Sequence, residues 1–178
     1  MMVTDWALSQ QKELNALSGV SISRWRGIEM AFESDEANPV WRHPSIDAIQ
    51  CTVVDVLVEE RWRRFGTSMG DDPATDWGLI VEDAPSDIEP IESDTTIFRI
   101  ADLSTLPRGI ISSVTLETDA YGMVGCMRIQ IGDTSVSLSA GEVYDKGTGG
   151  FRIADYDESL LIRLNNRHPE SGEQENCT

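Results

Sequence analysis

Basic residues and long apolar runs are both scarce in this sequence. Its 178 residues include 14 lysines and arginines against 31 aspartates and glutamates, which gives a formal net charge of −17. Phosphate binding depends on lysine and arginine, so this balance argues against nucleic acid and anionic membrane surfaces as partners. No apolar run approaches the ~20 residues that cross a bilayer. The first residues lack the basic region and apolar core of a signal peptide, so we expect a cytoplasmic protein.

Cysteine and histidine are also rare. The three cysteines, Cys51, Cys126 and Cys177, lie far apart and form no C-x-x-C pair, which argues against a zinc site or a disulfide framework. Cys51 and Cys126 fall in apolar, strand-like runs, so we expect both to be buried thiols. The histidines are His43, in a loop, and His168, near the end of the chain. A nucleophile–histidine site would have to use His43, and nothing in the sequence directs a nucleophile toward it.

One serine motif is present, but its surroundings do not suit catalysis. Residues 66–70 read Gly-Thr-Ser-Met-Gly, the spacing with which hydrolases expose a nucleophilic serine on a strand-to-helix turn. Here Asp71, Asp72 and Pro73 follow in place of a helix, and the adjacent acids would oppose an oxyanion. Asp71, Asp72 and Asp76 also lack the ligand spacing of a calcium loop. We therefore expect a turn, with no catalytic residue, metal or cofactor.

The clearest structural signal is a hairpin over residues 123–144. Apolar residues alternate with polar ones on both sides of a two-residue turn, where Gly132 supplies a positive φ. A loop of this length fixes three cross-strand pairs, namely Ile131 with Thr134, Ile129 with Val136, and Met127 with Leu138. In this register the apolar side chains meet on one face, and a slip by one residue would set apolar against polar.

The rest of the chain is predicted to be β-rich, with one helix at the N-terminus. Residues 4–18 carry a partial apolar stripe between a capping Thr4 or Asp5 and Gly19, which predicts a helix. Strands are predicted over residues 20–32, 46–58, 62–65, 77–81, 97–100 and 110–117, and a last hairpin over 151–153 and 160–164. We predict an α+β, β-rich domain over residues 1–165, in which antiparallel β-meanders pack together, followed by a disordered polar tail over residues 166–178.

An acidic window stands out within this predicted fold. The chain from Phe65 to Phe98 contains no lysine or arginine and is rich in aspartate, glutamate and proline. Such a run is usually a solvated loop. If the protein has an electrostatic binding surface, we expect it here, formed chiefly by Asp71, Asp72, Asp76, Glu82 and Asp83.

The C-terminal part of the sequence carries a resemblance. Residues 129–164 run through the hairpin turn, the segment Ser-Ala-Gly-Glu-Val-Tyr at 139–144, a glycine-rich loop and Asp-Glu-Ser-Leu-Leu-Ile at 157–162, and Trp77-Gly78-Leu79 adds to this pattern. This part is similar to bacterial immunity proteins of polymorphic or contact-dependent toxin systems. The resemblance implies a non-enzymatic protein that binds and neutralises a cognate toxin, whose surface we expect to be basic.

Two other functions stay open at this point. A small-molecule-binding module or minor hydrolase would need a pocket between the sheets that contains His43 or a pair of carboxylates. A structural or assembly subunit would need a large apolar surface for contact with itself.

Overall fold

The computed structural model describes residues 4–69, 76–88 and 96–166, and within them it shows one helix and nine strands. The elements in chain order are α1 (Asp5–Asn15), β1 (Ser21–Met30), β2 (Ile49–Val58), β3 (Arg61–Ser68), β4 (Gly78–Asp83), β5 (Phe98–Ile100), β6 (Gly109–Thr118), β7 (Val124–Ile131), β8 (Thr134–Asp145) and β9 (Phe151–Asn166). The predicted β-rich α+β class is therefore confirmed. No helix in the described part of the chain is long and apolar enough to span a membrane.

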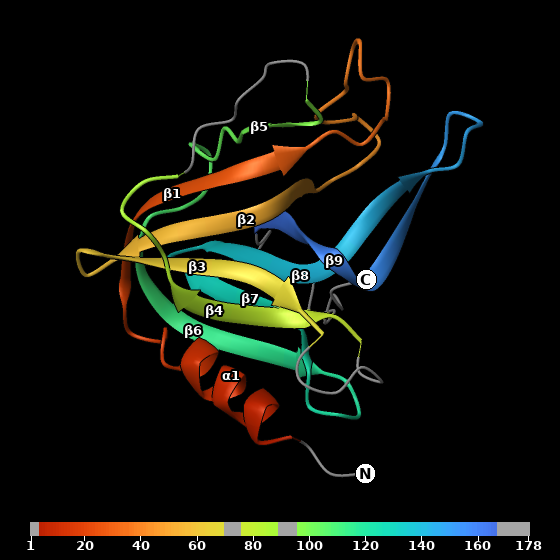
Figure 1. Cartoon of the computed structure of the whole chain (residues 1–178). Helices are drawn as coiled ribbons and strands as arrows, with labels where there is room; N and C mark the ends of the chain where they lie inside the picture. Colours follow the sequence, from red (N-terminus) through yellow and green to blue (C-terminus); the bar gives the residue numbers. More distant parts are fainter. Residues whose placement is uncertain (1–3, 70–75, 89–95, 167–178) are drawn as a thin grey trace.

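Two antiparallel meanders pack face to face, as Figure 1 shows. The first consists of β1, β2, β3 and β4, with β5 beside β1, and the second consists of β6, β7, β8 and β9. Two junctions connect them at opposite sides. Ser21 of β1 pairs with Ile110 of β6, and Ile49 of β2 pairs with Ile162 of β9. The packed meanders predicted from the sequence are thus present, and these junctions close them into one continuous sheet.

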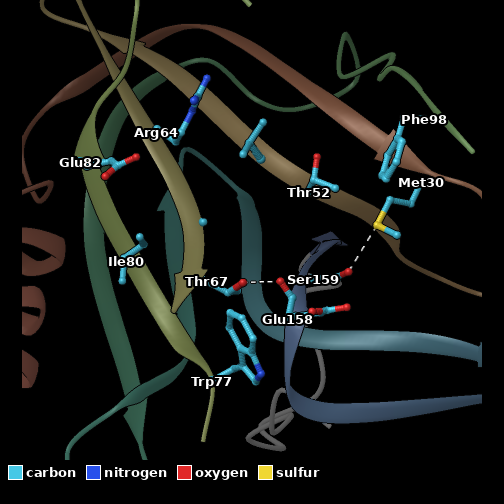
Figure 2. A pocket seen from close by; sticks show the side chains of 12 residues that line it. Met30, Thr52, Arg64, Thr67, Trp77, Ile80, Glu82, Phe98, Glu158 and Ser159 are labelled. Atoms are coloured by element: carbon cyan, nitrogen blue, oxygen red, sulfur yellow. Dashed lines mark hydrogen bonds between the residues drawn. The ribbon is translucent and has the colours of Figure 1, made fainter. Parts of the chain in front are cut away.

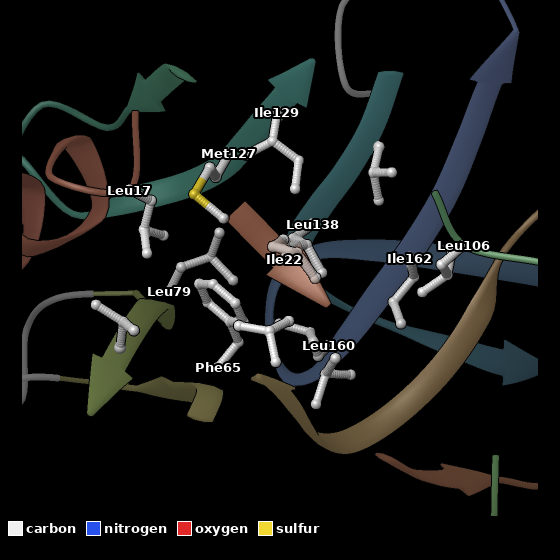
Figure 3. Packing of buried hydrophobic residues seen from close by; sticks show 14 of the residues in the cluster. Leu17, Ile22, Phe65, Leu79, Leu106, Met127, Ile129, Leu138, Leu160 and Ile162 are labelled. Atoms are coloured by element: carbon white, nitrogen blue, oxygen red, sulfur yellow. The ribbon is translucent and has the colours of Figure 1, made fainter. Parts of the chain in front are cut away.

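The core fills the space between the meanders. Phe65 and Leu79 from the first meander meet Met127 and Leu138 from the second, and each of these side chains is at most 1% exposed. Figure 3 shows this cluster at close range. Period-two alternation explains which residues enter it, because every second side chain of a strand faces the same layer.

Helix α1 packs against strands of both meanders. Its buried Leu14 joins the common core. The side chain of Gln11 donates to the carbonyl of Gly122 at 2.7 Å, and that of Gln10 accepts from the backbone N–H of Val81 at 3.1 Å. Thr4 caps the helix by accepting from the N–H of Ala7, as a threonine at this position does. The predicted N-terminal helix is confirmed.

The central hairpin has the predicted register. Ile131 pairs with Thr134, Ile129 with Val136, and Met127 with Leu138. Gly132 has a φ of 57°, which is the left-handed conformation that the two-residue turn requires.

The predicted last hairpin is wrong. Residues 151–166 form the single strand β9, which pairs with β8 along both halves but skips residues 156–159. Ala140 pairs with Leu160, whereas the next residue, Gly141, pairs with Asp155. Tyr156 starts this bulge with a φ of 56°, and its ring lies against Gly125, where an added Cβ would come within 2.4 Å of it. The turn-like composition at 155–158 marks a bulge in this fold.

The cysteines differ from the expectation in one respect. Cys51 is a free, fully buried thiol, and burial raises its pKa to about 12, with a smaller contribution from the negative charge of Glu29. Cys126 is also buried, but it is disulfide-bonded and therefore not the free thiol that we expected. Strand β9 reaches Asn166, and the rest of the predicted tail also lies outside the described residues.

Candidate functional site

A row of alternating charges crosses the outer face of the first meander. The strand register places Arg26 of β1 beside Asp55 of β2, Asp55 beside Arg64 of β3, and Arg64 beside Glu82 of β4. The neighbouring residues Val54, Phe65 and Val81 face inward to the core, so this row faces outward. The row therefore runs in the order plus, minus, plus, minus over four strands.

Asp55 is the centre of this row. Its carboxylate is completely buried and accepts from Arg64 at 2.8 and 3.1 Å and from Arg26 at 3.0 Å. The guanidinium of Arg26 lies 3.8 Å from the centre of the Trp62 ring. Arg26 also donates to the carbonyls of Pro85 and Ser86, which fixes the segment after β4 to the sheet. A buried charge needs partners of this kind, and here each arginine satisfies part of the carboxylate.

A groove of about 440 Å³ opens beside this row. It forms because β2 changes partner along one edge, pairing with β9 at Ile49–Cys51 and with β3 at Val54–Val58. Between these two segments, Thr52 and Val53 line the groove. Figure 2 shows the side chains around it, which come from β1, β2, β3, β5, β9 and the region of β4.

The bulge of β9 supplies one wall of the groove. Thr67 donates its hydroxyl to the carbonyl of Glu158, which ties the bulge to β3. The buried Ser159 hydroxyl lies 3.1 Å from Glu142 Oε2 and 3.4 Å from Met30 Sδ. These contacts hold the backbone of the bulge in place, and the Glu158 side chain is exposed.

The groove carries negative charges that no described residue neutralises. Among the described residues that line it, Arg64 is the one basic side chain, and Asp55 already binds that guanidinium. Glu82 and Glu158 are exposed, and neither carboxylate forms an ion pair within the described residues. Trp77 adds a half-buried aromatic ring. Such a groove suits a cationic group with an apolar or planar body.

The predicted binding residues are only partly brought together. Asp71 and Asp72 lie outside the described residues, and Asp76 is exposed just before β4. Glu82 lines the groove, whereas Asp83, the next residue on the strand, faces the other way and lies 3.6 Å from Arg63. Of the predicted set, Glu82 is therefore the residue that the structure places in the groove.

Other site residues were missed by the sequence prediction. Asp55 had a detectable signal, because it is the one charged residue in the strand 49–58. Glu158 and Trp77 lie far apart in the sequence and line the same groove only because of the bulge of β9, so no local pattern could join them.

The alternative sites from the sequence find no support in their geometry. Ser68, the serine of the 66–70 motif, ends β3 as part of a strand. His43 packs its ring against Phe151 at 4.6 Å, and its Nδ1 lies 2.8 Å from the Ser45 hydroxyl. His43 does not line the groove. Within residues 4–69, 76–88 and 96–166, no group of three or more histidine, cysteine or acidic side chains could hold a metal ion.

Replacing Glu142 with glutamine should reduce the pH dependence of stability. Burial raises the pKa of this carboxyl above its ordinary value of 4.5, the hydrogen bond from Ser159 opposes that shift, and the charges of Glu158 and Asp157 add to it. The native state therefore holds this proton more tightly than the unfolded state, so stability falls as the pH rises from the ordinary pKa through the raised one. Glu142→Gln removes this contribution.

Urea denaturation at a series of pH values from about 4 to about 7 measures this effect. The control is Glu60→Gln in the exposed β2–β3 turn, which should keep the wild-type slope. An unchanged slope in Glu142→Gln would contradict the prediction.

Comparison with protein-family models, with curated proteins and with solved structures found no match to this chain.

Proposed function

We propose that this protein is a non-enzymatic acidic binding protein of the immunity type, which binds the basic surface of a cognate toxin in the cytoplasm and neutralises it. The observation that carries the proposal is the groove with two exposed carboxylates, Glu82 and Glu158, and an arginine that Asp55 already holds. The net charge of −17 supports it, because long-range attraction speeds the encounter with a basic partner. The resemblance of residues 129–164 to immunity proteins points in the same direction.

A small-molecule-binding module is the second candidate. The groove volume of about 440 Å³ falls within the range of ligand pockets, and the groove contains a pair of carboxylates, Glu82 and Glu158. A ligand of this kind would have to be cationic or neutral, because the free carboxylates disfavour an anion.

Affinity capture distinguishes the two candidates. The tagged full chain serves as bait in a lysate of the source cells, and mass spectrometry identifies what is retained at low and at moderate salt. The proposal expects one basic protein that is retained specifically and lost as the salt concentration rises. Failure to retain a protein, together with a thermal shift by a small cationic metabolite, would favour the second candidate.

Charge reversal at Glu82 and Asp83 should slow association with the captured partner. In Glu82→Lys/Asp83→Lys, four units of charge change on β4, and we expect the association rate to fall about tenfold at low salt, with a weaker dependence on salt. Stopped-flow or surface-based kinetics at several salt concentrations measure both quantities.

The matched control is Glu59→Lys/Glu60→Lys in the β2–β3 turn, which changes the net charge equally at another exposed site. If both variants slow association to the same extent, the effect reflects overall charge, and these β4 residues do not form part of the interface.

A further inference from the structure

This chain holds two of its own arginines by the same arrangement. The guanidinium of Arg26 lies over the ring of Trp62 at 3.8 Å and pairs with Asp55 at 3.0 Å. The guanidinium of Arg99 lies 5.0 Å from the centre of the Trp41 ring and pairs with the buried Glu29. In both places a tryptophan face and a carboxylate together bind one planar cation.

The groove contains the same two parts, and none of the arginines in residues 4–69, 76–88 and 96–166 is paired with its Glu158 carboxylate. Trp77 and Glu158 both line it, and Figure 2 shows them at one end. Their proximity follows from the pairing, because Thr67 of β3 bonds to the carbonyl of Glu158 while its neighbour Ser68 pairs with Gly78, the residue after Trp77. Arg64, the arginine that lines the groove, is bound by Asp55 through two nitrogens.

We propose that this groove binds an arginine side chain of the partner protein, with its guanidinium against the Trp77 ring and paired with the Glu158 carboxylate. The inference rests on the proposed function and names the group of the basic partner that this site recognises. Glu82, at the other end of the groove, adds negative charge that favours a cation. Arginine fits better than lysine, because a planar guanidinium stacks on an aromatic face and meets a carboxylate with two N–H groups.

A capped amino acid tests the site without knowledge of the partner. The probe is N-acetyl-arginine amide, and its neutral isostere N-acetyl-citrulline amide is the matched ligand control. Titration of the full chain, labelled with ¹⁵N, is followed by NMR at the Trp77 indole N–H and the backbone N–H of Thr67. We expect saturable shifts at both positions with a Kd on the order of 1 mM for the arginine amide, and no saturable shift for the citrulline amide.

Two exposed glutamates supply the matched variants. Glu158→Gln keeps the shape of the side chain and should raise the Kd for the arginine amide at least about threefold, since a paired charge at an exposed site is lost. Glu60→Gln, in the β2–β3 turn, should leave the Kd unchanged. Equal binding of the citrulline amide, absence of shifts at Trp77, or an equal loss of affinity in both variants would each overturn the inference.

The capture experiment separates this inference from the proposed function. If wild type and Glu158→Gln retain the same basic partner equally well and neither binds the arginine amide, the groove is not the arginine site, while the proposed function stands. If the arginine amide binds as expected but no basic protein is retained, the proposed function fails, and the groove remains a guanidinium site.

Discussion

Replacing Asp55 with alanine should lower the free energy of unfolding by about 3–5 kcal/mol, as removal of one partner from a buried ion cluster does. The side chain is completely buried, and its loss leaves the guanidinium groups of Arg26 and Arg64 facing each other without the carboxylate that both bind. Their mutual repulsion adds to the loss of the hydrogen bonds. Urea denaturation followed by tryptophan fluorescence measures the change.

The last residue of the same charge row provides the control. Glu82→Ala removes an exposed carboxylate from β4 and should change the stability by no more than about 0.5 kcal/mol. A third variant, Asp55→Leu/Arg26→Met/Arg64→Met, replaces the whole cluster with apolar side chains and should recover most of the loss, because no charge is then left unpaired. If Asp55→Ala and Glu82→Ala lower the free energy of unfolding equally, the buried ion cluster does not stabilise the fold in the way described.

Truncating Phe65 to alanine should also lower the free energy of unfolding by about 3–5 kcal/mol. This loss combines the transfer free energy of the removed ring with the free-energy cost of the cavity that remains. Phe65 is 1% exposed and lies between Val54 and Val81 of the neighbouring strands. Its ring packs in the cluster that both meanders share, as Figure 3 shows. Few neighbours can move into the vacated space, since strands of two layers hold them in place.

An exposed apolar residue on a strand is the matched control. Ile110 on β6 is 64% exposed, so Ile110→Ala should cost less than about 1 kcal/mol in the same denaturation experiment. The urea m-value of Phe65→Ala should stay close to that of wild type, because the surface exposed on unfolding is nearly the same. A cost similar to that of Ile110→Ala would contradict a core shared by the two meanders.

The sequence predicted those features that depend on neighbouring residues. The β7–β8 register followed from alternation and from Gly132, since a two-residue turn leaves one pairing that buries the apolar side chains. The N-terminal helix followed from its cap and its stop signal. The bulge in β9 was misinterpreted as a turn, because a tyrosine with positive φ has no local signature and is held there by contact with Gly125.

The groove could not be predicted, because it depends on pairing between distant segments. Thr52 lines it only because β2 pairs with β9 before this residue and with β3 after it. The acidic window included Glu82, which lines the groove, whereas Glu158 lies on the opposite wall and belongs to another meander. The composition indicated a negative surface, but the strand topology determines which of its carboxylates line the same groove.

The two junctions between the meanders have a consequence for how the chain reaches this structure. Each joins distant parts of the sequence, since Ser21 pairs with Ile110 and Cys51 pairs with Leu160. Contacts of this kind require closure of long loops before they contribute any stability, which places folding in the millisecond-to-second class. Until β9 is synthesised and paired, β2 and β8 each keep an open edge, so the nascent chain depends on β9 for protection against intermolecular pairing.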